Sequence, residues 1–185
     1  MRKSFGAKPF IYPMPVLIIA SYDENGVPNA MNAAWGSAAD VNRIAIYVSA
    51  GHKTMKNILA RKAFTVSMAD EKNVVEADFV GVVSGNKTPD KLSRCGWHCT
   101  KSENVDAPLI DELPMALECE FLSYDEETGL LLGKIVNVCA EERILTDGKI
   151  DLGKFHPITY DPSGHGYHTL GEKVGNAFSD GKKLK

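Results

Sequence analysis

Apolar runs and alternating positions in the first half of the chain predict β-strands joined by tight turns. Residues 16–20 form an apolar run, and the Asp-Glu-Asn-Gly sequence at residues 23–26 is typical of a hairpin turn. Residues 27–31 are therefore expected to return beside residues 16–20. Further strands are predicted at residues 44–48, which are bounded by turn-forming residues, and at residues 64–68, which alternate.

Helical periodicity is confined to short segments. Residues 54–61 place Met55, Ile58 and Leu59 on one helical face, with Thr54 or a neighbour as the expected N-cap. Shorter helices are expected at residues 73–79 and 90–95.

The second half of the chain predicts a long hairpin. Residues 117–121 alternate strictly, so Leu117, Cys119 and Phe121 are expected to face inward while Glu118 and Glu120 face water. After a turn, residues 130–139 form the longest apolar run and are expected to pair with this strand. Short elements are expected near residues 158–160 and 167–170.

Many strands with few long helices favour a mostly β protein with short helices, built as a closed or split β-barrel rather than a parallel sheet. The chain has 185 residues, of which 44% are hydrophobic and 24% charged. This composition is ordinary for a soluble protein, and a single domain is expected over residues 1–185.

Composition also limits which binding partners and which cellular compartment are expected. The net charge of -3 gives no excess of positive charge of the kind that favours binding of nucleic acid. No apolar run approaches the ~20 residues that span a bilayer, so no membrane association is expected. The basic N-terminus has no apolar signal region after it, and we expect a cytoplasmic protein whose four cysteines are reduced thiols.

The segment from residue 29 to residue 54 carries two different binding signals at opposite ends of the strand 44–48. One end combines amides, small side chains and an indole in Asn29-Ala30-Met31-Asn32-Ala33-Ala34-Trp35-Gly36-Ser37. The other end, Ser49-Ala50-Gly51-His52-Lys53-Thr54, follows a strand and opens a helix, where backbone N–H groups and the helix dipole favour an anion. A flat polar ring with an anionic tail, as in a mononucleotide, suits this arrangement.

Structural explanations exist for both signals. An ordinary strand-to-helix turn with a capping threonine accounts for the second segment equally well. Trp35 is equally explained as a core or subunit-interface aromatic. The phosphate-loop and dinucleotide-binding glycine patterns are absent, which disfavours ATP and dinucleotide folds.

A second donor loop lies at Ser84-Gly85, followed by Lys91 at the start of a predicted helix. Two lysines converging on one phosphate are physically sensible, because a phosphate carries about -1.5 to -2 charge at neutral pH. Taken alone, Lys91 is more often a surface residue.

Cysteines and histidines give weaker signals. Cys95, His98 and Cys99 invite a zinc or thiol-sensor hypothesis, but no second pair completes a structural zinc set, and we expect no metal site. His156, His165 and His168 gather near the C-terminus, where histidines relay protons, line a nicotinamide pocket or simply accumulate in polar loops. No hydrolase arrangement stands out.

The order of these motifs resembles the flavin reductase-like, FMN-binding split-barrel family, and within it the flavoredoxin branch. The resemblance covers nearly the whole chain. Its motifs are Pro15-Val16-Leu17, Asn32-Ala33-Ala34-Trp35, Lys53-Thr54, Ser84-Gly85 with Asp90-Lys91, Asp106-Ala107-Pro108, Leu117-Glu118-Cys119, Gly133-Lys134-Ile135-Val136 and the run from residue 170 to residue 178.

The resemblance implies a Greek-key-like split barrel that binds FMN noncovalently at a homodimer interface. It implies ring and ribityl contacts from Asn29, Asn32, Ala33, Ala34 and Trp35. It implies phosphate contacts from Ser49, His52, Lys53, Thr54, Ser84, Gly85 and Lys91. Some relatives carry a histidine within residues 130–133 and an aromatic residue where this chain has Ser163, and these departures concern the nicotinamide-facing side.

The resemblance also implies an oxidoreductase, an NAD(P)H-dependent flavin or ferric reductase in which NADH or NADPH supplies a hydride. The alternative is a flavoredoxin-type electron-transfer protein that retains FMN and is reduced by a redox partner protein. Because the flavin carries out the redox chemistry, no catalytic side chain is assigned.

Overall fold

Strand β2 (Leu17–Tyr22) is buried on both faces in the computed structural model, which describes residues 1–184. Ile18 and Ala20 pack in one apolar cluster, whereas Leu17 and Ile19 point into a second cluster on the other face. Opposite orientation of successive side chains explains why this run is continuously apolar rather than alternating.

A seven-stranded antiparallel sheet curls into a half-barrel around the second cluster. Its strand order is β3 (Pro28–Ala33), β2, β6 (Ala63–Met68), β9 (Met115–Asp125), β10 (Leu130–Ala140), β5 (Arg43–Tyr47) and β4 (Gly36–Asp40). The β2–β3 and β9–β10 hairpins pair as the sequence predicts. The prediction of a mostly β protein is therefore confirmed.

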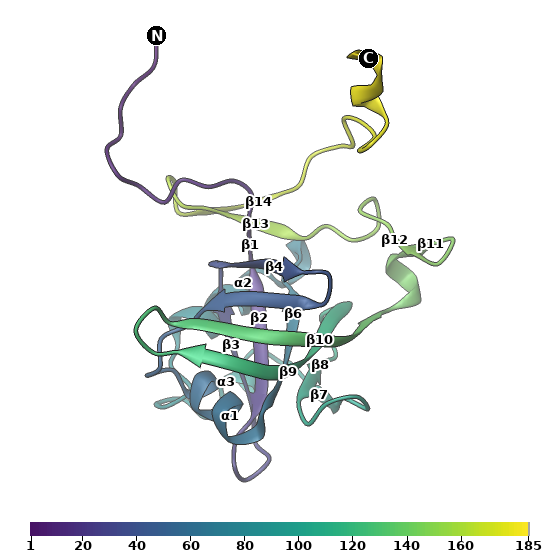
Figure 1. Ribbon diagram of the computed structural model, residues 1–185. Helices are drawn as coiled ribbons and strands as arrows, with labels where there is room; N and C mark the ends of the chain where they lie inside the picture. Colours follow the sequence, from purple (N-terminus) through teal and green to yellow (C-terminus); the bar gives the residue numbers. More distant parts are fainter. Residues whose placement is uncertain (185) are drawn as a thin grey trace.

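Smaller sheets flank the half-barrel. They are β1 (Met14–Pro15) with β13 (Ile158–Asp161) and β14 (Gly166–Thr169), β7 (Cys99–Lys101) with β8 (Pro108–Ile110), and β11 (Leu145–Thr146) with β12 (Lys149–Ile150). Figure 1 shows both ends of the chain projecting from the side on which β13 and β14 lie.

The helices are short, as predicted. They are α1 (Lys53–Arg61), α2 (Val74–Val82) and α3 (Lys91–Arg94), and 3-10 helices cover Glu71–Asn73, Glu142–Ile144 and Asp180–Leu184. Helix α2 extends beyond the predicted end at residue 79. Within residues 1–184, no helix combines the length and apolar character needed to cross a membrane.

Strand β4 is not expected from the sequence, and it changes the geometry of the binding segment. Its residues are mostly exposed, so they show no apolar pattern. Strand β4 runs back along β5, and the N–H of Tyr47 donates to the carbonyl of Trp35 at 2.8 Å. The prediction that the two binding signals lie at opposite ends of β5 is therefore wrong, because both reach the same end.

The expectation that Glu118 faces water is also wrong. Its side chain is buried, and its carboxylate accepts hydrogen bonds from Ser102 Oγ at 2.5 Å, from Asn104 Nδ2 at 3.0 Å and from Asn137 Nδ2. Strand alternation cannot reveal this, because two of the donors, Ser102 and Asn104, come from the loop between β7 and β8, which is distant in the sequence. Glu120, two residues later, is exposed as predicted.

We expect Glu118→Ala to destabilise the fold by about 2–4 kcal/mol, because it leaves several buried donors without their acceptor. Urea unfolding of both proteins measures the difference. Glu120→Ala removes an exposed carboxylate from the same strand and is expected to change stability by less than about 0.5 kcal/mol. Equal effects of the two substitutions would contradict a structural role for the buried carboxylate.

Candidate functional site

A cavity of about 660 Å³ opens where β3, the end of β5, the start of α1 and the loop after α2 meet. Every predicted site residue lines it. They are Asn29, Asn32, Ala33, Ala34, Trp35, Ser49, His52, Lys53, Thr54, Ser84, Gly85 and Lys91. Its size lies within the ~300–1,000 Å³ typical of cofactor pockets.

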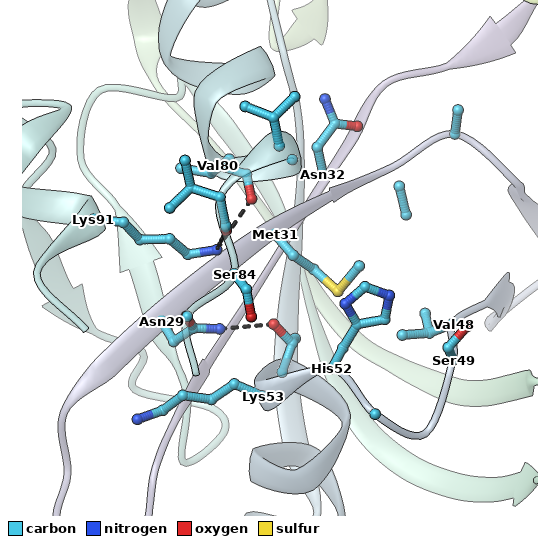
Figure 2. Close-up of a pocket in the computed structure, with 18 of the residues that line it drawn as sticks. Asn29, Met31, Asn32, Val48, Ser49, His52, Lys53, Val80, Ser84 and Lys91 are labelled. Carbon is cyan, nitrogen blue, oxygen red and sulfur yellow. Dashed lines mark hydrogen bonds between the residues drawn. The ribbon is translucent and has the colours of Figure 1, made fainter. Parts of the chain in front are cut away.

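One end of the cavity is built from hydroxyl groups. The Asn29 side chain donates from Nδ2 to Thr54 Oγ1 at 2.7 Å, and both residues are buried (Figure 2). Because this bond uses the oxygen of Thr54 as acceptor, the threonine O–H remains a donor toward the cavity. The N-cap of α1 is the neighbouring His52 rather than Thr54, and Thr54 lines the cavity.

Gly85 is required by the close approach of Asn29. A Cβ atom at residue 85 would lie 2.1 Å from Asn29 Oδ1, a distance that no side chain tolerates. A larger residue at position 85 would have to displace the buried Asn29 side chain or the loop after α2, and the close approach brings Ser84 beside the hydroxyl end.

Lys91 is buried, contrary to the ordinary expectation for a lysine. Its ammonium donates to the carbonyls of Val80 at 3.0 Å and Val83 at 3.1 Å, at the C-terminal end of α2, where the helix dipole favours a cation. Burial lowers the pKa of Lys91 to about 8. A positive charge thus lies in the cavity wall near neutral pH and is lost in mildly alkaline solution.

Lys53 lines the cavity with its stem, while its ammonium is engaged elsewhere. Its Nζ lies 3.0 Å from Asp23 Oδ2, and Figure 2 shows it turned outward, away from the Ser84 hydroxyl. The two lysines therefore flank the hydroxyl end from different sides.

The other end of the cavity, called the ring end, is lined by Asn32, Ala33, Ala34 and Trp35. Asn32 donates from Nδ2 to the carbonyl of Ala77 at 3.0 Å, which fixes β3 against α2. Ala33 and Ala34 are half-buried, and Trp35 lines this end with 56% of its surface exposed. A core role for Trp35 is therefore wrong.

Sequence reasoning missed further residues that line the cavity. They are Met31, Tyr47, Val48, Gly51, Val80, Gly81, Val82 and Val83. Tyr47 and Val48 directly precede the predicted anion segment, so their position at the strand end is a usable signal. The residues at the end of α2 carry no such signal, because the predicted helix stops before them.

The three histidines near the C-terminus lie beside other polar side chains, away from this cavity. His156 pairs with Glu71 at 2.7 Å, His165 with Tyr160 at 2.7 Å, and His168 lies 3.9 Å from Asp161. None of these histidines lines the cavity.

The cysteine motif gains no support as a metal site. Burial raises the pKa of Cys95 and raises that of Cys99 to about 11, which opposes the thiolate form that metals bind. His98 pairs with Glu112 at 2.7 Å. Among residues 1–184, no group of three or more candidate ligands is arranged to hold a metal ion.

Comparison with protein families matches residues 10–166 to the flavin reductase like domain. The chain belongs to this family. Flavoredoxin of Desulfovibrio vulgaris (Miyazaki F) is 35% identical, with a TM-score of 0.93 over 98% of this chain and 100% of that chain. The resemblance to flavin reductase-like proteins and their flavoredoxin branch is thereby confirmed.

A structure of much lower sequence identity has the same fold. A split-barrel flavin reductase-like structure from Shewanella frigidimarina is 16% identical over 90% of this chain and 86% of that chain, with a TM-score of 0.77. This likeness shows the fold alone and confirms the split barrel. An uncharacterized protein of Aeropyrum pernix is 30% identical over 81% of this chain. The chain spans only 58% of the length of that relative.

We expect Gly85→Ala to destabilise this flavin reductase-like domain by about 1–3 kcal/mol, because the added methyl group overlaps Asn29 and forces the loop from β3. Urea unfolding measures the loss. Gly51 lines the same cavity, but no atom lies within 4 Å of the place that an added methyl group would take, so Gly51→Ala is the matched control. Similar costs for both variants would contradict the close approach.

Proposed function

We propose that this chain is a flavoprotein that binds FMN noncovalently in the 660 Å³ cavity. The observation that carries the proposal is the convergence of all predicted ring and phosphate residues, from separate segments, on this one cavity. Membership of the flavin reductase-like family supports it.

The donor set fits the two ends of the cofactor. At the hydroxyl end, Thr54 and Ser84 supply O–H donors, and Ser49 supplies another where the chain leads from β5 to α1. His52 and Lys53 open helix α1, whose first N–H groups have no intrahelical partner. At the ring end, Asn32, Ala33, Ala34 and Trp35 would accept a planar ring. The chain's own residues would thus fix the phosphate and leave the ring at the open edge beside Trp35.

We propose an oxidoreductase activity, in which NADH or NADPH reduces the flavin and the electrons pass to free flavin or ferric iron. When bound, FMN supplies the capacity to accept a hydride and release electrons singly or in pairs. The residues of the cavity would hold and orient the ring. No side chain needs to act as a general acid or base.

A flavoredoxin-type electron carrier is the second candidate. The specific observation that favours it is the 35% identity to a flavoredoxin across almost the full length of both chains. Such a protein would retain FMN and receive electrons from a redox partner protein instead of a nicotinamide.

The two candidates predict different steady-state behaviour. A reductase is expected to oxidise NADH or NADPH in a reaction that depends on added FMN, FAD or riboflavin, followed at 340 nm. A flavoredoxin-type carrier is expected to purify yellow and to be reduced by a partner reductase while leaving both nicotinamides unoxidised. Purified protein that neither contains nor binds flavin would contradict both.

We also propose a homodimer in the cytoplasm. Trp35 and Tyr47, which border the ring end of the cavity, are 56% and 51% exposed, which is unfavourable for large aromatic side chains unless a second subunit covers them. Size-exclusion chromatography with light scattering is expected to give twice the mass of one chain. A monomeric mass with FMN bound would contradict this proposal.

The pKa of Lys91, about 8, predicts that FMN affinity falls in alkaline solution. A bound phosphate dianion stabilises the ammonium and raises its pKa, so binding above pH 8 takes up a proton and becomes weaker as pH rises. We expect a loss approaching about tenfold between pH 7 and pH 9, measured by quenching of flavin fluorescence.

Lys91→Gln is the matched variant for this titration. Glutamine still donates a hydrogen bond to one of the two carbonyls but does not titrate. Its affinity for FMN is expected to be lower at pH 7 and nearly constant up to pH 9. A parallel decline in the variant would assign the pH dependence to another group.

A further inference from the structure

The ammonium of Lys53 is committed to a carboxylate that lies outside the cavity. Its Nζ is 3.0 Å from Asp23 Oδ2, and the two side chains are only 22% and 14% exposed. Asp23 is in the turn between β2 and β3 and does not line the cavity, whereas the stem of Lys53 does. The predicted phosphate contact therefore already has an anionic partner.

The carboxylate of Asp23 is held in place by its other contacts. Its Oδ1 accepts the N–H groups of Asn25 at 3.0 Å and Val27 at 2.9 Å. The guanidinium of Arg61, at the far end of α1, donates to the carbonyl of Asp23 at 2.7 and 2.9 Å. The turn is thus fixed to both ends of the helix, and Asp23 cannot follow Lys53 if the lysine moves.

Asp23 is charged at neutral pH. Burial raises its pKa, but the hydrogen bonds from the Val27 N–H and the Lys53 ammonium outweigh burial, and the net pKa is lowered. A fixed negative charge next to Lys53 cancels most of the attraction that the lysine would offer to a second anion.

The other lysine of the cavity wall does not compensate for this loss. The ammonium of Lys91 donates to two backbone carbonyls, and part of its charge is lost in mildly alkaline solution. The phosphate end therefore offers hydroxyl and N–H donors but little free positive charge until Lys53 leaves Asp23. A lysine side chain has enough rotatable bonds for this rearrangement.

We propose that Asp23 competes with the cofactor phosphate for the ammonium of Lys53 and thereby sets how strongly the site prefers a phosphorylated flavin. This inference rests on the proposed binding of FMN. Binding of FMN exchanges the Lys53–Asp23 ion pair for a Lys53–phosphate pair. Binding of riboflavin, which has no phosphate, leaves the Lys53–Asp23 pair intact. Asp23 is thus a specificity-determining residue that does not touch the ligand.

Removal of the charge of Asp23 tests the proposal. In Asp23→Asn, the amide oxygen still accepts the N–H groups of the turn, but the side chain no longer carries a charge. We expect the dissociation constant for FMN to decrease about three- to tenfold, as removal of a competing ion pair and of a nearby like charge allows. The dissociation constant for riboflavin is expected to change less than twofold, so the FMN-to-riboflavin preference rises.

Asp106→Asn is the matched control. Asp106 pairs with Arg61 at 3.1 Å, beside the same turn, and does not contact Lys53. Both flavins are expected to bind this variant as they bind the wild type. In a Lys53→Met background, Asp23→Asn is expected to lose most of its effect on FMN affinity, because the ammonium for which Asp23 and the phosphate compete is absent.

The outcomes separate this inference from the proposed function. If the wild type binds neither flavin, both fail. If the wild type binds FMN but Asp23→Asn leaves the preference unchanged, or weakens both flavins equally, only the role of Asp23 is overturned. Should Asp23→Asn not fold, Asp23→Ser retains a hydroxyl acceptor for the turn and is subject to the same criteria.

Discussion

The hydrogen bond from Asn29 to Thr54 is the contact on which the cavity depends. It joins β3 to the first turn of α1, and the side of Asn29 away from Thr54 packs against Gly85 in the loop after α2. Three segments that are separated in the sequence therefore meet at one buried amide. Because a buried amide is costly unless it is paired, this arrangement favours a single geometry over alternatives. The ring end and the hydroxyl end of the cavity keep their spacing because β3 carries both Asn29 and Asn32, which bind α1 and α2 respectively.

Much of the fold follows from periodicity, and the exceptions have physical causes. The strands around the barrel core are apolar enough to be predicted, and their hairpins follow from turn residues. Strand β4 escapes prediction because it lies at the edge of the sheet and is exposed, so it has no apolar face. Glu118 is wrongly predicted to face water because the loop between β7 and β8 supplies hydrogen-bond donors to a face that an isolated strand would leave in water. Both errors concern what lies beside a strand, which the strand's own sequence does not encode. The extent of the domain, residues 1–185, stays a prediction.

The sequence predicts which residues line the candidate cavity, but it does not predict which of their charges are already paired. Motif order and residue type bring together side chains that all line the cavity. The same motifs suggest two free lysines directed at a phosphate, whereas Lys53 is paired with Asp23 and Lys91 donates to the end of α2. Spacing in the sequence could not identify the partners of the two lysines. Asp23 has the sequence context of an ordinary turn residue, and backbone carbonyls of α2 have no sequence signature. Electrostatic partners are set by tertiary contacts, so residue types alone overestimate the free positive charge of a site.

This charge balance bears on whether a cofactor stays bound or exchanges. A site with two uncompensated lysines would hold a phosphate dianion strongly and release it slowly. In this chain, Thr54 and Ser84 already lie at the hydroxyl end, while each lysine would have to give up a partner or share its ammonium to contribute a full charge to a bound phosphate. The cost of that exchange is subtracted from the gross attraction, which favours moderate affinity and faster release. At the ring end, the exposed Trp35 lies apart from both lysines, so under the proposed function contacts of the ring with a second subunit or a redox partner would not depend on the phosphate contacts. Retention of the cofactor and access to its ring would thus depend on different ends of one cavity.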